Sequence, residues 1–261
     1  MIRLIASDID GTLVKDGSDH INPRLFEIIT ELKKKNILYA AASGRQFPSM
    51  RRLFAPVQDN VIFIAENGAY VVCRDSEMSY TPMDRETVEA IVMQMRNCPN
   101  CCLTASGKEA TYIESQDEDF IDLLVNGYHN TIQIVEDVLK ADTTFIKLAL
   151  YNKTGIHQQA EQLIKQWNKR VKVVVAGKQW LDFMDLSVDK GQALARIQQI
   201  TGISREETIC FGDNSNDIGM FHQAGRSYAV ATANPEVQRE ADQVIGTYET
   251  DGVLKELEKL L

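Results

Sequence analysis

The sequence predicts an α/β protein with a Rossmann-like, doubly wound and mainly parallel sheet as its core, into which a second, α+β domain is inserted. Three observations lead to this prediction. Short apolar runs alternate with helical stretches over residues 1–82, helices alternate with hairpin strands after Pro82, and the first pattern resumes at Val188. We therefore expect a core domain of residues 1–82 and 187–261 and an inserted domain of residues 83–186.

The composition sets outer bounds on function. The 261 residues, 44% of them hydrophobic, suffice for two modest domains, and the net charge of −9 argues against a nucleic-acid or membrane surface. There is no secretory leader pattern, because Asp8 and Asp10 interrupt the first apolar run, and no apolar stretch is long enough to span a bilayer. The five cysteines are an odd number, which favours reduced thiols and a cytoplasmic location. We expect a monomer or a weak homodimer.

The first strand ends in a polar turn that carries two aspartates. The apolar residues between Ile2 and Ala6 are typical of a buried parallel strand, and the sequence then breaks into Ser-Asp-Ile-Asp-Gly-Thr. In open α/β sheets, ligands bind outside the carboxyl ends of the strands, which is where Asp8 and Asp10 stand. Gly11 lets the backbone turn tightly and leaves room for a ligand beside the main-chain N–H groups.

Two carboxylates at this spacing can divide the work of a group transfer. One can attack an electrophile while the other moves a proton, and a divalent cation would relieve their repulsion. At about 4 Å and an effective dielectric constant near 20, a like-charge pair costs roughly 4 kcal/mol, so an anionic substrate would need that cation. The alternative is an Asp-rich turn that caps the following helix.

The rest of the first half continues the doubly wound pattern. Residues 24–36 have apolar positions at helical spacing, and residues 37–43 form a second apolar strand that ends in Ser43-Gly44-Arg45. Such a turn suits a phosphate, although taken alone it is better explained as a plain helix start with Ser43 as its cap. Residues 60–72 are predicted as two strands around Glu66-Asn67-Gly68, a turn with Asn or Gly at positive φ.

In the inserted segment, helices alternate with hairpin strands. Asp84 can cap a helix that runs through Met95, and residues 101–106 and 110–115 flank a short turn as a hairpin. The remaining predicted elements of the insert are helices at 120–125 and 155–168 and strands at 143–151, 171–177 and 180–186.

The doubly wound pattern resumes with Val-Asp-Lys-Gly at residues 188–191. A helix over 192–202 closed by Gly202 leads to a buried strand over 207–213 and a polar turn over 214–217. Further predicted elements are helices at 218–225, 233–241 and 251–261 and a strand at 227–231.

Four polar turns therefore stand at strand ends or helix starts: residues 8–12, 43–45, 189–191 and 212–217. Each has an ordinary explanation when taken singly, since Lys190 alone would be a surface lysine and Asp213 and Asp217 could cap a helix. Together they supply what phosphoryl transfer requires, namely a nucleophile, a metal site, a cation and hydrogen-bond donors for phosphate oxygens.

In their order, these turns resemble the four motifs of the haloacid dehalogenase-like superfamily. The stretches D-I-D-G-T-L-V, A-S-G-R, E-N-G-A, V-D-K-G and G-D-N-S-N-D are similar to the Cof-type phosphatase branch, which has a large insert between motifs two and three, and the resemblance covers essentially the whole chain. It implies that the insert is a cap that closes over the active site and sets specificity. Arg45, Glu66 and Asn67 are candidate substrate contacts together with polar loops of the cap.

The resemblance also implies roles for individual residues. Asp8 would be the nucleophile that forms an aspartyl-phosphate, and Asp10 would protonate the leaving oxygen and then activate water. The phosphate would be bound by the amide of Ile9 and by Ser43, Gly44, Lys190 and Asn216. Magnesium would be held by Asp8, the Asp10 main-chain carbonyl and Asp213, with support from Asn214 or Asp217.

The predicted function is a magnesium-dependent phosphatase acting on a small phosphorylated metabolite, foremost sugar phosphates, with pyridoxal phosphate and flavin mononucleotide as further substrates. The alternatives are a phosphomutase of the phosphomannomutase type and a non-catalytic sensor of a phosphorylated metabolite. Two departures from the family pattern are Ser43 where Thr is common and Thr232 where Asn is common. The cluster Cys98, Cys101 and Cys102 could suggest zinc, but no second Cys or His pair has suitable spacing, so reduced thiols without a site are favoured.

Overall fold

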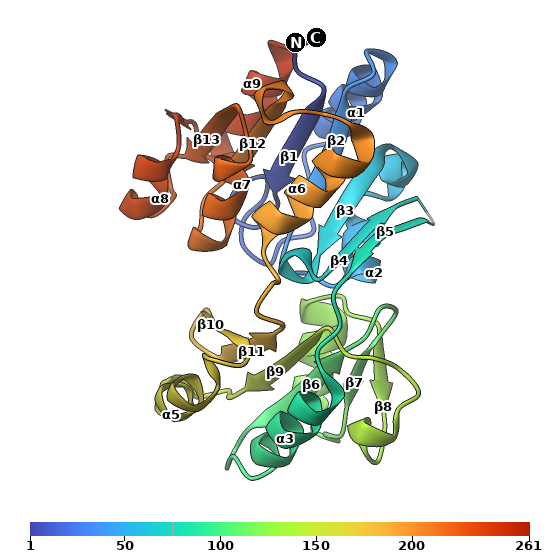
Figure 1. Cartoon of the computed structure of the whole chain (residues 1–261), viewed down its shortest axis with the longest axis vertical. Coiled ribbons are helices and arrows are strands. Elements are labelled where there is room, and N and C mark those ends of the chain that lie inside the picture. The colour runs from blue at the N-terminus through green and yellow to red at the C-terminus, as the bar shows by residue number, and fades with distance from the viewer. Residues whose placement is uncertain (75) are drawn as a thin grey trace. The chain divides into compact units, whose positions relative to one another are not determined.

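The computed structural model describes residues 1–74 and 76–261 and divides them into two compact units. Unit 1 comprises Met1–Ser79 and Asp189–Leu261, and unit 2 is the continuous segment Tyr80–Val188 (Figure 1). Each unit is built on its own sheet. The predicted α/β class is confirmed, since unit 1 carries a large and mostly parallel sheet flanked by helices.

Unit 1 contains a sheet of eight strands in the order β14-β13-β12-β1-β2-β3-β4-β5. The neighbouring strands from β14 through β3 are parallel, and β3 and β4 form an antiparallel pair. The strands are β1 (Leu4–Asp8), β2 (Leu38–Ala42), β3 (Val61–Ala65), β4 (Tyr70–Cys73), β5 (Ser76–Tyr80), β12 (Thr208–Gly212), β13 (Arg226–Val230) and β14 (Gln243–Ile245).

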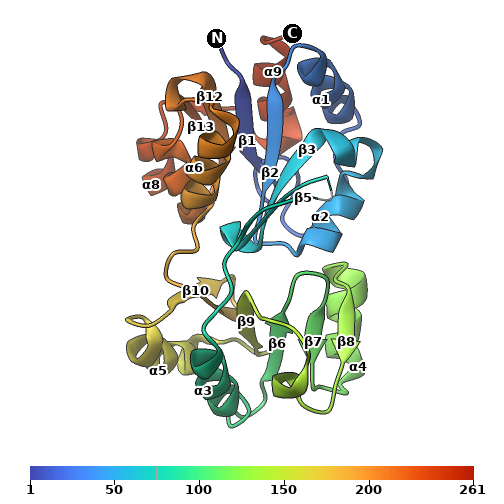
Figure 2. The same cartoon turned by 45° about the vertical axis from the view of Figure 1, so that its right-hand side comes forward.

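Helices cover both faces of this sheet. Figure 2 shows α6 on one side of the central strands and α1 on the other. The apolar face of α1, with Leu25, Ile28, Ile29 and Leu32, is buried, as its helical spacing predicts. The helices of unit 1 are α1 (Arg24–Lys34), α2 (Phe47–Leu53), α6 (Lys190–Thr201), α7 (Ile218–His222), α8 (Pro235–Glu240) and α9 (Gly252–Glu258).

The central strand β1 is buried along its whole length, and its neighbours place three polar turns beside one another. Asp8 ends β1 and pairs in register with Ala42 of β2, while Ser7 pairs with Phe211 of β12. Because the three strands are parallel, the loops that follow them meet at one edge of the sheet. The two chain ends lie at the opposite end of this unit (Figure 1).

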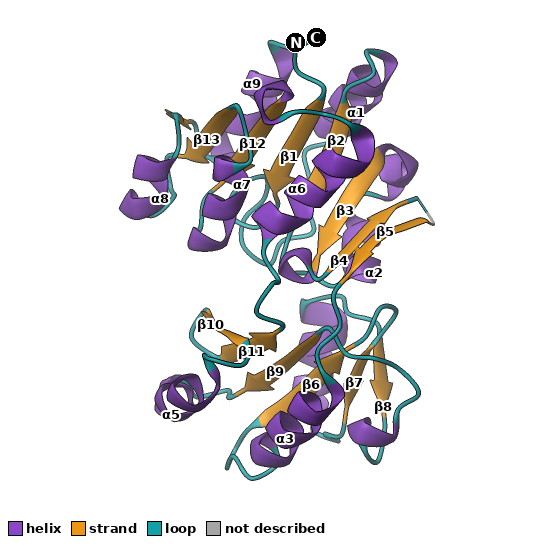
Figure 3. Ribbon diagram, in the orientation of Figure 1, coloured by secondary structure: helices purple, strands orange, loops and turns teal. Residues whose placement is uncertain are grey.

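Unit 2 contains a sheet of six strands in the order β10-β11-β9-β6-β7-β8 (Figure 3). All neighbouring pairs are antiparallel except β7 and β8, which are parallel. The elements are α3 (Arg85–Met95), β6 (Cys102–Ser106), β7 (Thr111–Ile113), α4 (Glu118–Asp122), β8 (Ile132–Ile134), β9 (Lys147–Tyr151), α5 (His157–Trp167), β10 (Lys172–Ala176) and β11 (Trp180–Met184).

The main apolar core of unit 2 joins α3 and α5 to the sheet, with Ile91, Leu148 and Phe183 fully buried in it. The predicted cap of α3 is confirmed, because the Asp84 side chain accepts a hydrogen bond from the amide of Thr87. The strands β5, β8 and β14 were not expected, since they are short and partly exposed and lack an apolar run. Among the described residues, no helix is long and apolar enough to cross a membrane.

Candidate active site

The side chains of Asp8, Lys190 and Asp217 form a buried chain of hydrogen bonds at the edge where β1 and β12 end. Lys190 Nζ donates to Asp8 Oδ1 at 2.6 Å and to Asp217 Oδ1 at 2.7 Å. The Lys190 side chain is completely buried. This finding contradicts the alternative that Lys190 is an ordinary surface lysine, because a lysine is rarely buried unless carboxylates pair with it.

The charges of this cluster do not balance. Asp8, Asp213 and Asp217 offer three carboxylate atoms within 4.8 Å of one another, against one ammonium group. Burial raises the pKa of Asp8 well above its usual range, and Asp217 raises it further, while Lys190 acts in the opposite direction. Burial lowers the pKa of Lys190, but the two carboxylates outweigh that effect and raise it. The excess negative charge favours a further cation.

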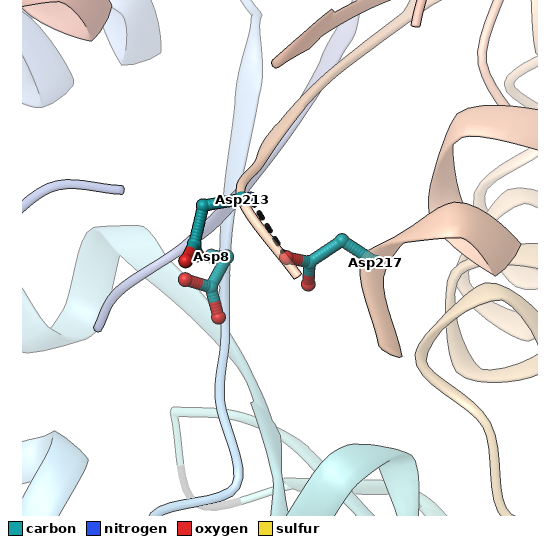
Figure 4. A group of neighbouring side chains, drawn as sticks. All are labelled: Asp8, Asp213 and Asp217. Carbon is teal, nitrogen blue, oxygen red and sulfur yellow. Dashed lines mark hydrogen bonds between the residues drawn. The ribbon is translucent and has the colours of Figure 1, made fainter. Parts of the chain in front are cut away.

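Asp213 faces Asp8 from the loop that follows β12 (Figure 4). Thr12 Oγ1 donates a hydrogen bond to Asp213 Oδ1 at 3.0 Å. A Cβ atom on Gly11 would lie 2.4 Å from Asp213 Oδ2, and Gly11 has a φ of +88°, so both the conformation and the close approach require glycine. Burial raises the pKa of Asp213, and the neighbouring Asp217 adds to this shift.

These residues fit a magnesium ion. Asp8 Oδ2 is buried and has no hydrogen-bond partner among the described residues, so the nucleophile candidate presents an unsatisfied oxygen. Carboxylate oxygens are the ligands that Mg²⁺ prefers, and an added cation would offset the excess charge of the cluster. A divalent cation held by oxygens therefore suits the donor set at this edge.

Asp217 and Asn214 hold the loop itself. Asp217 Oδ2 accepts hydrogen bonds from the amides of Asp213 and Asn214, both at 3.0 Å, and Figure 4 shows the first of them as a dashed line. Since Lys190 occupies Oδ1, both Asp217 oxygens have partners within the protein. Asn214 caps the next turn, with its side-chain oxygen accepting from the amide of Ser215 at 2.8 Å. These contacts favour a supporting role over direct metal binding for both residues.

Asp10 lies beside this cluster in a clamp that sequence reasoning did not foresee. Arg45 donates from Nε to Asp10 Oδ2 at 2.8 Å and from Nη2 to Oδ1 at 2.5 Å. Ser43 Oγ donates to Oδ2 at 3.2 Å, and the amide of Gly17 donates to Oδ1 at 3.1 Å. The Asp10 carboxylate therefore accepts four hydrogen bonds. The sequence could have indicated this contact, because Asp10 follows the end of β1 and Arg45 follows the end of the adjacent parallel strand β2.

The remaining predicted phosphate contacts come from three loops. Ser43 is buried, and its Oγ accepts from the amide of Arg45 at 3.0 Å. Ile9 has a fully buried side chain, so a contact with a ligand would use its backbone. Asn216 Nδ2 donates to Asn67 Oδ1 at 3.0 Å, and a Cβ atom on Gly44 would lie 3.3 Å from Asn67 Nδ2. The amide of Asn67 also donates to Ser43 O at 2.9 Å, so Asn67 contacts both the Ser43–Arg45 loop and Asn216.

The cysteines take no part in a recognised site. All five are free thiols. Among the described residues, the one group of His, Cys, Asp or Glu side chains that could hold a metal ion is the aspartate cluster. Burial raises the pKa of Cys98 and of Cys101, which makes thiolate chemistry unfavourable. These observations agree with reduced thiols in the Cys98–Cys102 segment.

Comparisons with known proteins match the whole chain. A model of the haloacid dehalogenase-like hydrolase family matches residues 5–257. The chain is 26% identical over 261 residues to 5-amino-6-(5-phospho-D-ribitylamino)uracil phosphatase YbjI of Escherichia coli, covering 100% of this chain and 96% of that protein. It is 25% identical over 258 residues to YcsE of Bacillus subtilis, which is also named a 5-amino-6-(5-phospho-D-ribitylamino)uracil phosphatase. That match covers 97% of this chain and 94% of YcsE. Among solved structures, the chain is similar to a protein from Eubacterium rectale, with 34% sequence identity and a TM-score of 0.92. The match covers 100% of this chain and 99% of that one.

Proposed function

Since the chain belongs to the haloacid dehalogenase-like hydrolases, we propose that it is a magnesium-dependent phosphatase that hydrolyses small phosphomonoesters through an aspartyl-phosphate. The family and the named phosphatase relatives make the chain a phosphoric monoester hydrolase. We propose three further points, namely the metal, the covalent intermediate and the substrate class.

The single observation that carries the proposal is the environment of Asp8. Lys190 holds one oxygen of this carboxylate at 2.6 Å, while the other oxygen is buried and has no hydrogen-bond partner among the described residues. A carboxylate fixed by one oxygen can attack phosphorus with the other. The attack forms an Asp8–phosphorus acyl-phosphate bond and breaks the bond between phosphorus and the oxygen of the leaving alcohol.

In this proposal, Asp10 moves the protons of both half-reactions. It would donate a proton to the departing oxygen and later take a proton from the water that hydrolyses the acyl-phosphate, so that Asp8 and inorganic phosphate are released. General acid–base assistance of this kind is worth about 10² to 10⁴ in rate. Both oxygens of the Asp10 carboxylate accept hydrogen bonds, four in all among the described residues. At least one of them must be exchanged before Asp10 can act as the acid.

The donors for the phosphoryl oxygens would be the Ile9 amide, Ser43, Gly44, Asn216 and the third N–H of Lys190. Two of the three Lys190 N–H groups donate to Asp8 and Asp217, and these two hydrogen bonds fix the direction of the third. Such preorganised donors stabilise the charge that develops on the transferring group more than they stabilise the free substrate.

Asp8, Asp213 and the main-chain carbonyl of Asp10 would hold the magnesium ion, and Asp217 and Asn214 would shape the loop around it. When bound, the ion supplies positive charge that offsets the repulsion between these carboxylates and an incoming phosphate. The unsatisfied Asp8 oxygen and the excess of carboxylates support this part of the proposal.

Sugar phosphates and related phosphorylated polyols are the substrate class that we favour. Three relatives from Escherichia coli and Bacillus subtilis are named for a substrate that carries a phosphorylated ribityl chain. Another relative is a phosphoglycolate phosphatase from Metallosphaera sedula, so the leaving group varies among relatives of similar identity. Substrate choice would fall to unit 2, which we propose is the cap over the active site. A cytoplasmic location and a monomer or weak homodimer complete the proposal.

The test is release of inorganic phosphate from a broad panel of phosphomonoesters, with magnesium and with a chelator. Asp8→Asn serves as the blank, because an amide cannot form the acyl-phosphate. Magnesium-dependent release that is lost in Asp8→Asn is the expected result, and substantial turnover by Asp8→Asn would remove the covalent step. Asp10→Ala should lose at least about 10²-fold in rate on sugar phosphates. Unchanged activity in that variant would contradict the proton-transfer role.

A further inference from the structure

The turn between β3 and β4 has an uncommon backbone. Glu66, Asn67 and Gly68 have φ values of 49°, 57° and 102°, so two non-glycine residues in succession are left-handed. Residues other than glycine rarely adopt this backbone conformation unless surrounding contacts impose it. The amides of this turn supply such contacts, because Glu66 N donates to Arg45 O at 3.0 Å and Asn67 N donates to Ser43 O at 2.9 Å.

The same turn touches three segments that are expected to bind phosphate. Its backbone holds the Ser43–Arg45 loop, as described above. The Asn67 side chain accepts a hydrogen bond from Asn216 Nδ2 at 3.0 Å. A Cβ atom on Gly68 would lie 2.6 Å from the carbonyl oxygen of Asp189, the residue before Lys190, so the turn abuts that segment as well.

The Asn216 amide has one hydrogen-bond partner among the described side chains, which is Asn67. Because Asn67 Oδ1 accepts from Nδ2, the carbonyl oxygen of Asn216 points away, where it is buried and has no hydrogen-bond partner among the described residues. An unpaired buried carbonyl is unfavourable, so the amide would not take this orientation without the acceptor on Asn67. The orientation leaves the second hydrogen of Nδ2 available to a phosphate oxygen.

We propose that Asn67 is a positioning residue for the phosphoryl group, which sets Asn216 through its side chain and the Ser43–Gly44 turn through its backbone before a substrate binds. This inference rests on the proposed phosphatase function. It differs from the expectation that Asn67 contacts the variable part of the substrate. A residue that acts on the phosphoryl group affects all phosphomonoesters alike, whereas a contact to the leaving group affects some more than others.

The main variant is Asn67→Gly, since glycine keeps the positive φ and removes the amide. Asn36→Gly is its matched control, because Asn36 is an exposed asparagine with a φ of 61° after α1. Affinity for inorganic phosphate in the presence of magnesium is measured by calorimetry, and kcat/KM is measured for p-nitrophenyl phosphate and for a sugar phosphate. We expect Asn67→Gly to weaken phosphate binding by about tenfold and to lower kcat/KM by a similar factor of about ten for both substrates. Asn36→Gly should change neither quantity.

Three results for Asn67→Gly would contradict a positioning role for Asn67. Unchanged phosphate affinity together with a loss that differs between the two substrates would make Asn67 a leaving-group contact. A lower melting temperature with intact phosphate affinity would make it a structural turn residue. In an Asn216→Ala background, Asn67→Gly should cost less than it does alone, and full additivity would show that it does not act through Asn216. The calorimetry needs no turnover, so a failure of the proposed phosphatase activity would be seen separately.

Discussion

A buried charge cluster in unit 1 and a charge cluster in unit 2 each pair carboxylates with one basic side chain, but with opposite effects on the charge of the carboxylates. In unit 1, Asp8, Asp213 and Asp217 surround Lys190, and the Asp8 and Asp213 carboxyls have raised pKa values because burial and mutual repulsion disfavour their charges. This arrangement costs folding free energy and leaves one Asp8 oxygen without a hydrogen-bond partner in the part of the chain that the structure describes.

The cluster in unit 2 is satisfied within the protein. Arg96 donates to both oxygens of Glu114 and also to Asp137 Oδ1, at 2.5 Å. The amide of Val138 donates to Glu114 Oε1 at 2.8 Å. The hydrogen bond from Arg96 lowers the pKa of Asp137, so the folded state favours its charge. Arg96 thus favours the charged form of Asp137, whereas burial and the neighbouring Asp217 disfavour the charged forms of Asp8 and Asp213.

Replacement of the lysine in the first cluster should give the largest effect. Lys190→Met retains much of the side-chain length but leaves the Asp8 and Asp217 carboxylates without their buried partner. Loss of one member of a buried ion pair costs about 3–5 kcal/mol, so we expect that loss in urea unfolding together with loss of phosphatase turnover. Wild-type stability in Lys190→Met would show that the carboxylates do not repel one another as the structure implies.

Magnesium should distinguish the two clusters by its effect on stability. At a hundred times its dissociation constant, a ligand that binds only the folded state adds about 2.7 kcal/mol to the free energy of unfolding. Wild-type protein should show this gain by thermal unfolding with magnesium against chelator, and Asp213→Asn should lose most of it. Glu114→Gln, which alters the cluster in unit 2, should keep the full gain. An equal gain in Asp213→Asn would place the ion elsewhere.

Replacement of Arg96 should destabilise the protein without affecting the chemistry. Hydrogen bonds to charged groups contribute about 1.5–3 kcal/mol, so Arg96→Met should lower the free energy of unfolding by about that amount while kcat stays unchanged. Arg85→Met at the start of α3 is the control, because the Arg85 side chain is exposed. Its contacts, an ion pair with Glu89 and a hydrogen bond to the Leu139 carbonyl, should contribute less than about 1 kcal/mol. A large loss of kcat in Arg96→Met would couple this cluster to catalysis.

The smallest expected effect is a dependence on pH at Asp137. Arg96 lowers the pKa of this carboxyl below its ordinary value of 3.8, so its contribution is present above 3.8 and is lost as the pH falls through the lower folded-state value. The stability difference between wild type and Arg96→Met should therefore shrink toward the acid limit of the folded state in urea titrations. A difference that grows on acidification would reverse the assigned sign.

Sequence reasoning was strongest where local chemistry decides structure. The apolar run before Asp8, the Asp84 cap and the glycine that closes α6 each depend on a few neighbouring residues, and the structure confirms them. The positive φ predicted for the turn at Asn67 and Gly68 is also confirmed. The lengths and ends of short, half-exposed strands were not predictable, because hydrogen bonds to distant strands define them.

The partners of site residues were the least predictable part. The motif turns indicated that Asp10 and Lys190 would gather at one sheet edge, but not that Arg45 would clamp Asp10 or that Lys190 would bridge two aspartates. Side-chain pairing at such an edge depends on loop conformations that have no periodic signal. The catalytic and ligand-binding roles of these residues stay predictions.

The pairing of β1 with β12 has a consequence for synthesis on the ribosome. Leu4 of β1 lies opposite Thr208 of β12, and all of unit 2 is translated between them. Unit 2 is continuous in sequence and can fold while β1 to β5 still lack their central neighbour. Asp8 is therefore translated before unit 2 and can meet Lys190 and Asp213 only after unit 2 has been translated. Until Lys190 and Asp213 have been added, the residue that we propose as the nucleophile lies in an incomplete site, so we expect no phosphatase turnover from it.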